Sequence, residues 1–154
     1  MRRVFLLLGT GIAILFLTIW LSPGSNAQST QQQLTVLSSS SRTATTTSDA
    51  LLNGLGVRGA YVILKVSGAA STPIITPSIQ ILDPVGGGYV NVLVASSGVT
   101  TNGTYTYLVY PGIGSAASGV TQVASFPLAN AWRVSVAHDD TDAITYSVGA
   151  QLIQ

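Results

Sequence analysis

The sequence has very little charge. Only 7% of its 154 residues are charged, against roughly a quarter in an ordinary soluble domain. Every acidic residue is an aspartate, and the sequence contains no glutamate. Serine, threonine and glycine take the place of charged residues, so the chain does not depend on lysine and glutamate for its solubility. This composition is typical of a domain that is exported, assembled into a larger particle, or both.

Cysteine is absent as well. Its absence excludes a disulfide framework and a thiolate metal site. After residue 27 the chain has five aspartates and four basic side chains, which are Arg42, Arg58, Lys65 and Arg133. This set contains no basic stripe for phosphate contacts, which argues against a nucleic-acid partner. We also expect no cofactor.

A long apolar run opens the chain. Arg2 and Arg3 precede an uncharged run of 18 residues from Val4 to Leu21, and small residues stand just before Gln28. This is the layout of a secretory signal peptide, although the run also reaches the lower length limit of a membrane-spanning helix. We therefore expect residues 1–27 to be a cleaved signal peptide or a retained membrane anchor, in which case residues 4–21 are the membrane contact.

The remaining chain divides into a polar spacer over residues 28–33 and a β-sandwich domain over residues 34–154. Both interpretations of the N-terminus place this domain outside the cell. We expect it to be extracellular or on the cell surface, with a membrane-anchored or virion location as the alternative.

From residue 34 onward, β-branched and aromatic residues alternate with other residues and are interrupted by turn residues, a pattern typical of short strands. The Thr/Ser-rich connection 41–56 has little period, and Ala50–Leu55 within it could form a turn of helix. The pattern predicts an all-β, antiparallel, jelly-roll-like sandwich of eight or nine strands after an N-terminal apolar helix. The predicted strands are 34–38, 60–67, 77–82, 88–96, 103–111, 123–128, 131–138 and 143–153.

The alternation also assigns strand faces. It predicts that Val90, Val92 and Val94 face the core while Tyr89 and Asn91 face outward. In the last two strands it predicts apolar faces that meet in one core, with residues 138–142 closing a hairpin between them. Those faces comprise Trp132, Val134, Val136 and His138 on one strand, and Ile144, Tyr146, Val148 and Ala150 on the other.

Two turn-related features refine this arrangement. The segment 83–89, with its aspartate, proline and three glycines, predicts a hairpin loop. Pro77 lacks the N–H group that a strand donates to its neighbour, so we expect the strand 77–82 to lie at a sheet edge.

The stretch "HDDTD", residues 138–142, has three interpretations. Asp140 and Asp142 have the spacing of the first ligands of a calcium loop, but the later ligands of that loop are missing. His138 with an aspartate could form a base and its orienting group, yet the sequence has no G-x-S-x-G nucleophile motif. We interpret the stretch as a turn, with Asp140 and Asp142 as weak metal candidates and with no catalytic residue.

Tyrosines are the candidate ligand-binding residues. Tyr105, Tyr107 and Tyr110, together with Tyr89 and Tyr61, could form an aromatic platform for sugars. Tyr89, Tyr105 and Tyr107 are the preferred candidates, and Tyr105 and Tyr107 share one strand face. Tyrosine also packs across strands in ordinary sheets, so the alternative is a structural role.

Several segments together resemble a group of small all-β proteins encoded in phages and prophage-like regions. They are "SRTATTTS" (41–48), "IQILDPVGGGYVNVL" (79–93), "TYTYLVYPGI" (104–113) and "WRVSVAHDDTDAITYSVGAQLI" (132–153). The resemblance extends, in order, over most of residues 34–154. It implies an all-β fold and a virion-associated structural role, and it carries no catalytic residues. The apolar N-terminus departs from the family pattern and suggests a cellular surface protein or a membrane-inserted virion protein.

These observations predict a non-enzymatic, exported structural module. We expect it to act by self-association, as a homo-oligomer such as a trimer, or by coating a larger surface or capsid-like assembly. The alternative is a carbohydrate-binding or adhesin-like module that uses the surface tyrosines. An enzyme built around His138 is the third hypothesis.

Overall fold

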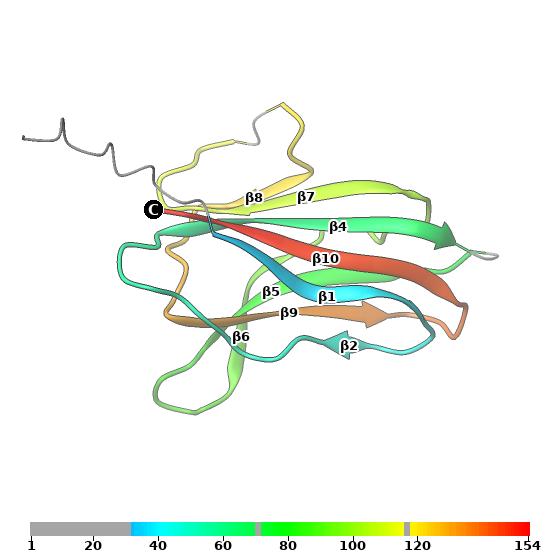
Figure 1. The fold of residues 1–154 in the computed structure, drawn as a ribbon, viewed down its shortest axis with the longest axis horizontal. Coiled ribbons are helices and arrows are strands. Elements are labelled where there is room, and N and C mark those ends of the chain that lie inside the picture. The colour runs from blue at the N-terminus through cyan, green and yellow to red at the C-terminus, as the bar shows by residue number, and fades with distance from the viewer. Residues whose placement is uncertain (1–31, 70–71, 116–117) are drawn as a thin grey trace, which may run out of the picture.

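The protein consists of two β-sheets in the computed structural model, which describes residues 32–69, 72–115 and 118–154 (Figure 1). The all-β prediction is confirmed, and none of the described residues forms a helix long and apolar enough to cross a membrane. The predicted N-terminal helix lies outside the described residues. The described residues form ten strands, instead of the eight or nine predicted: β1 (Gln33–Arg42), β2 (Thr46–Thr47), β3 (Leu51–Leu52), β4 (Gly59–Ala69), β5 (Ile75–Leu82), β6 (Tyr89–Val94), β7 (Gly103–Val109), β8 (Gln122–Ala124), β9 (Ala131–His138) and β10 (Ile144–Ile153).

The strands pair in a nested order. Sheet A has the order β1-β10-β4-β7-β8, and sheet B has the order β2-β9-β5-β6, with β3 also on β9. The first strand thus pairs with the last, β2 and β3 with β9, β4 with β7, and β5 with β6, all antiparallel. Only β8 runs parallel to its neighbour, β7. The chain is therefore one long hairpin, with its tip between β5 and β6, wound into two sheets.

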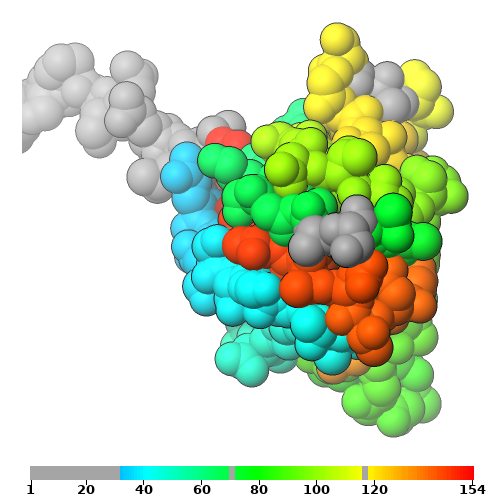
Figure 2. Space-filling view, turned by 90° about the vertical axis from the view of Figure 1, so that its right-hand side faces the viewer, coloured from blue at the N-terminus to red at the C-terminus, as the bar shows by residue number. Residues whose placement is uncertain are grey.

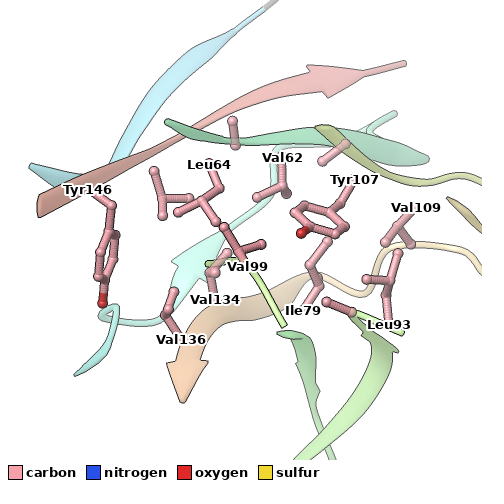
Figure 3. Close-up of a cluster of buried hydrophobic side chains, with 14 of the residues drawn as sticks. Val62, Leu64, Ile79, Leu93, Val99, Tyr107, Val109, Val134, Val136 and Tyr146 are labelled. Atoms are coloured by element: carbon pink, nitrogen blue, oxygen red, sulfur yellow. The ribbon is translucent and has the colours of Figure 1, made fainter. Parts of the chain in front are cut away.

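The core lies between the two sheets. Figure 3 shows Val62, Leu64 and Tyr107 from sheet A packing toward Ile79 and Val134 from sheet B. Val62, Leu64 and Val66 of β4 are buried, as are the apolar residues at alternate positions of β9 and β10 that were predicted to face the core. Period-two alternation therefore identified the core faces of β9 and β10 correctly.

The segment after β9 is not a hairpin, contrary to the prediction. β9 belongs to sheet B and β10 to sheet A, so residues 139–143 cross from one sheet to the other. The apolar faces of the two strands still meet, because they face each other across the sandwich instead of lying side by side. β9 pairs along most of its length with β5, and β10 lies between β1 and β4.

The predicted hairpin loop 83–89 is confirmed. The N–H of Asp83 donates to the Gly88 carbonyl (2.8 Å), and that of Gly87 donates to the Asp83 carbonyl (3.0 Å). Gly87 has a φ of 69°, a conformation that favours glycine. The Asp83 carboxylate accepts the Val85 N–H (2.9 Å), and backbone N–H groups of Val85 and Gly86 lower the pKa of this carboxyl.

The predicted faces of β6 are partly wrong. Val94 is 42% exposed, whereas Leu93 is buried in the core. Val90 lies on the same face as its partner Ile81, as predicted, but is 49% exposed. The pairing with β5 shifts between Ile79–Leu93 and Gln80–Asn91, which leaves Val92 as an extra residue. Such a bulge reverses the alternation beyond it, and the sequence pattern carries no sign of it.

β5 is an internal strand, so the edge position predicted from Pro77 is also wrong. Pro77 pairs with Val136 on β9, and its carbonyl accepts the Ala95 N–H (2.9 Å) on the other side. The N–H groups of alternate residues point the same way, and that of Ile75 donates to Val99. The missing N–H of Pro77 therefore faces the segment between Ala95 and Val99, where β6 has already ended.

The connection 41–56 contains the short strands β2 and β3, not a turn of helix. Polar side chains attach it to the core strand β9. The buried Ser48 accepts the Val134 N–H through its Oγ (3.1 Å). Asn53 donates from Nδ2 to the Ala129 carbonyl (2.8 Å) and accepts the indole N–H of Trp132 (2.8 Å).

Candidate interaction surface

The β9–β10 connection is held by its own carboxylates. Asp140 accepts the N–H of Ile74 through Oδ2 (2.8 Å) and that of Asp142 through Oδ1 (3.0 Å). Asp139 accepts the hydroxyl of Thr76 (3.3 Å), and Asp142 accepts the N–H of Thr72 (3.4 Å). Figure 2 views this end of the molecule, where the orange connection lies beside the cyan end of β1. The aspartates thus stabilise two neighbouring loops.

The predicted metal candidates do not gather further ligands. Asp140 and Asp142 use carboxylate oxygens to bind backbone N–H groups. Within the described ranges, no group of three or more metal-ligating side chains comes together. The geometry is that of a turn, which was the preferred interpretation of the sequence.

His138 lies in a polar corner without the partners that the enzyme hypothesis requires. Both ring nitrogens are buried and have no hydrogen-bond partner among the described residues, and the hydroxyl of the nearby Tyr146 is buried as well. The two rings lie 6.1 Å apart, and the Arg42 guanidinium lies 4.4 Å from the centroid of the Tyr146 ring. The arrangement of a base with an aspartate orienter and a serine is not formed.

We expect His138 to make the domain sensitive to mild acid. Burial lowers the pKa of the imidazole; Arg42 adds to this shift, while Asp140 and Asp139 oppose it. As the pH falls, His138 is protonated in the unfolded chain before it is protonated in the folded one. The domain therefore loses stability below about pH 6.5. Replacing the residue by phenylalanine (His138→Phe) removes this loss and leaves stability near pH 8 similar.

The measurement is urea unfolding of both proteins between about pH 8 and pH 5. A wild-type free energy of unfolding that does not change over this range would contradict this role of His138. So would a pH dependence of the His138→Phe variant equal to that of the wild type.

The three tyrosines predicted to bind sugar do not form one platform. Tyr105 and Tyr107 share a strand face as predicted, but it is the inner face, and Tyr107 is only 2% exposed. The Tyr105 hydroxyl hydrogen-bonds with Thr101 (2.9 Å). Tyr89 lies on the other sheet, with the Arg133 guanidinium 3.9 Å from its ring centroid. Sequence alternation could not tell the inner face from the outer one here.

Two other tyrosines do come together. Tyr61 and Tyr110 line a hollow of about 260 Å³, and the Arg58 guanidinium lies 5.5 Å from the centroid of the Tyr110 ring. The rest of the lining is aliphatic, from Leu108, Ile113 and Ile153. The register pairs Tyr61 with Leu108 and with Gln151, which places this hollow on the outer face of sheet A.

Three consecutive strands of the sandwich contain no charged residue. No charged residue or histidine occurs from Pro84 to Trp132, a stretch that includes β6, β7 and β8. The aspartates and basic residues all lie on other strands or loops. We call the surface formed by β6, β8 and the segments beside them the uncharged side. Its exposed apolar side chains include Val90, Val94 and Phe126.

The uncharged side contains one edge strand of each sheet. β6 ends sheet B, and β8 ends sheet A. Gln122 of β8 connects them, because its side chain donates to the Val94 carbonyl (2.8 Å) and accepts the Ser96 N–H (2.7 Å). This surface was not predicted from the sequence, although the absence of charged residues between Asp83 and Arg133 was an available signal.

Comparison with known proteins yields little. Neither a family model nor a curated protein sequence matches the chain. Among solved structures, a chain from the structure of infectious bursal disease virus, Gx strain, is similar, with a TM-score of 0.40 and 15% sequence identity. The similarity covers 79% of this chain and 30% of that chain, so this chain spans less than a third of the length of its structural neighbour.

Proposed function

We propose that this protein is an exported, non-enzymatic structural module that assembles with copies of itself through its uncharged side. The observation that carries the proposal is that two sheet edges lie close together and are formed by strands that contain no charged residue. Open edges present unpaired backbone groups, and natural proteins usually protect them with charge or with a covering segment.

Physical chemistry favours self-association at such a surface. The centres of protein interfaces are depleted in charged residues, because an unpaired charge is costly to remove from water. A symmetric contact also brings each residue near its own copy or near a close neighbour, so any charge there meets its like. The uncharged side avoids both costs and adds apolar area from Val90, Val94 and Phe126.

The topology supports an assembly role by analogy. If β2 and β3 are counted as one interrupted strand and β8 is set aside, eight strands form four nested antiparallel pairs wound into two sheets. We infer a jelly roll, the architecture that recurs in viral capsid domains and lectins. A fold of this kind hosts many functions, so this support is weaker than that of the surface.

Location follows from the N-terminal sequence. We infer that residues 1–27 direct export and are either cleaved or kept as an anchor. In both cases the assembled module lies at a surface outside the cell, or on a virion as the resemblance to phage-encoded proteins implies.

A carbohydrate-binding function is the second candidate. The hollow lined by Tyr61 and Tyr110 favours it, because tyrosine rings stack on the apolar faces of sugars and present a hydroxyl to water. This pair replaces Tyr105 and Tyr107 as the candidate aromatic contact, since Tyr107 is buried.

The deciding experiment measures the mass of the native protein. Intact-mass spectrometry identifies the start of the mature chain, and light scattering over a range of concentrations gives the mass of the assembly. We expect a defined oligomer. A protein that stays monomeric at every concentration would contradict the proposal, and polysaccharide binding that is lost on replacing Tyr110 by alanine would then favour the second candidate.

A further inference from the structure

We propose that a second copy of this chain pairs antiparallel with the free edge of β6, around a two-fold axis at Val90. This inference rests on the proposed function and adds to it the strand, the register and the symmetry of one contact. Its occupant is another copy of the same chain.

The backbone groups of Tyr89 and Asn91 point away from β5. The Asp83 N–H donates to the Gly88 carbonyl, so these two residues form a hydrogen-bonded pair. Along an antiparallel ladder, bonded pairs alternate with non-bonded ones. The next pair, Leu82 with Tyr89, is therefore non-bonded, as is Gln80 with Asn91. Residues in such pairs direct their N–H and carbonyl groups to the other side of the strand.

The same edge is closed further along. Beyond the bulge at Val92, the Gln122 side-chain amide hydrogen-bonds to the Val94 carbonyl and the Ser96 N–H. It takes the place that a neighbouring strand would have there. The open part is therefore short and runs from Tyr89 to Asn91. This limit favours a closed pair of copies over continued sheet growth.

A two-fold axis at Val90 gives hydrogen-bond partners to the backbone N–H and carbonyl groups of Tyr89 and Asn91 in both copies. Tyr89 of one copy then lies opposite Asn91 of the other, and each such pair exchanges two hydrogen bonds. Between them the two Val90 residues form a non-bonded pair, with Cα atoms about 4.5 Å apart. Val90 is 49% exposed in the single chain, so the contact also covers apolar surface.

The features of the molecule favour a second copy as the occupant. β6 carries no charge, so two β6 strands meet without repulsion, and its hairpin projects from the body of the molecule (Figures 1 and 2). The other edges are less suitable for pairing. β1 has two register shifts, β8 has three residues, and β2 and β3 have two residues each.

A cysteine at the axis tests the register. The natural chain contains no cysteine, so Val90→Cys introduces one thiol per copy. Directly opposed residues at about 4.5 Å fall within the Cα range of a disulfide. We expect mild oxidation to convert most of this variant into a covalent dimer. The matched control, Thr104→Cys on the exposed outer face of β7, is expected to remain largely uncrosslinked.

A proline tests the backbone bonds. Asn91→Pro removes an N–H that β5 does not use, so the domain is expected to fold. We expect the dissociation constant of the dimer contact to rise by about tenfold or more, because two intermolecular bonds are lost. The matched control, Asn91→Ala, keeps the N–H and is expected to retain the contact. Light scattering measures assembly, and circular dichroism checks that both variants fold.

The outcomes separate this inference from the proposed function. The β6 contact is supported if Val90→Cys crosslinks and if assembly is weakened by Asn91→Pro but not by Asn91→Ala. A wild-type oligomer that the proline variant leaves intact, without crosslinking at Val90, overturns the β6 contact and leaves self-association standing. A wild-type protein that is monomeric at all concentrations overturns both.

Discussion

Replacing Trp132 by alanine is expected to lower the free energy of unfolding by about 3–5 kcal/mol. Trp132 is fully buried and is the largest side chain in the core. It lies on β9, between Leu51 of β3 and Ile81 of β5. Truncation removes its apolar contacts, opens a cavity, and leaves the Asn53 side-chain oxygen without the indole donor. The loss exceeds that at an exposed position, because neighbouring strands cannot collapse into the space.

Urea unfolding followed by far-UV circular dichroism measures this change. Trp132→Phe keeps an aromatic ring and loses only the indole hydrogen bond and part of the volume, so we expect a smaller loss of about 1–3 kcal/mol. Leu55→Ala, at a fully exposed residue in the connection after β3, is expected to change stability by less than about 0.5 kcal/mol. Similar values for Trp132→Ala and Leu55→Ala would contradict the assigned core.

Strong alkali is expected to destabilise the domain through Tyr107. Burial raises the pKa of this phenol to about 12, and the nearby Tyr105 adds to the shift. The unfolded chain ionises first, near pH 10, so the folded state loses stability as the pH rises from about 10 toward 12. Two pKa units correspond to at most about 2–3 kcal/mol, and solvent screening reduces this figure.

The measurement is the free energy of unfolding at several pH values between about 9 and 11.5, for the wild type and for Tyr107→Phe. The variant is expected to lose less stability over this range. Part of the loss remains, because burial also raises the pKa of Tyr146. Equal losses in the two proteins would mean that Tyr107 is not protected from ionisation in the folded state.

The uncharged side illustrates how function can depend on topology. The charge-free stretch from Pro84 to Trp132 is visible in the sequence, but its meaning depends on where its strands lie. If β6 and β8 occupied the middle of their sheets, the same residues would be ordinary packing. Because both strands end their sheets and Gln122 joins them, the stretch becomes a continuous surface.

The site residues divide in the same way. The role of the aspartates after β9 was predictable, because short polar side chains in a turn bind nearby backbone groups. The identity of those groups, in the segment from Thr72 to Thr76, depends on two loops distant in sequence. The tyrosine platform failed for a related reason. Alternation places two residues on one face but does not say whether that face meets the core.

By itself, the sequence determined the class of structure and the core faces of the last two strands. Alternating apolar residues specify strands with one buried face, and so Trp132, Val134 and Ile144 were assigned to the core correctly. The hairpin after Asp83 was predictable because its turn residues act locally. The tertiary structure alone decided which strands are neighbours. Pairing joins residues far apart in sequence, so it placed β9 and β10 in different sheets, set Pro77 in an internal strand and left β6 with a free edge.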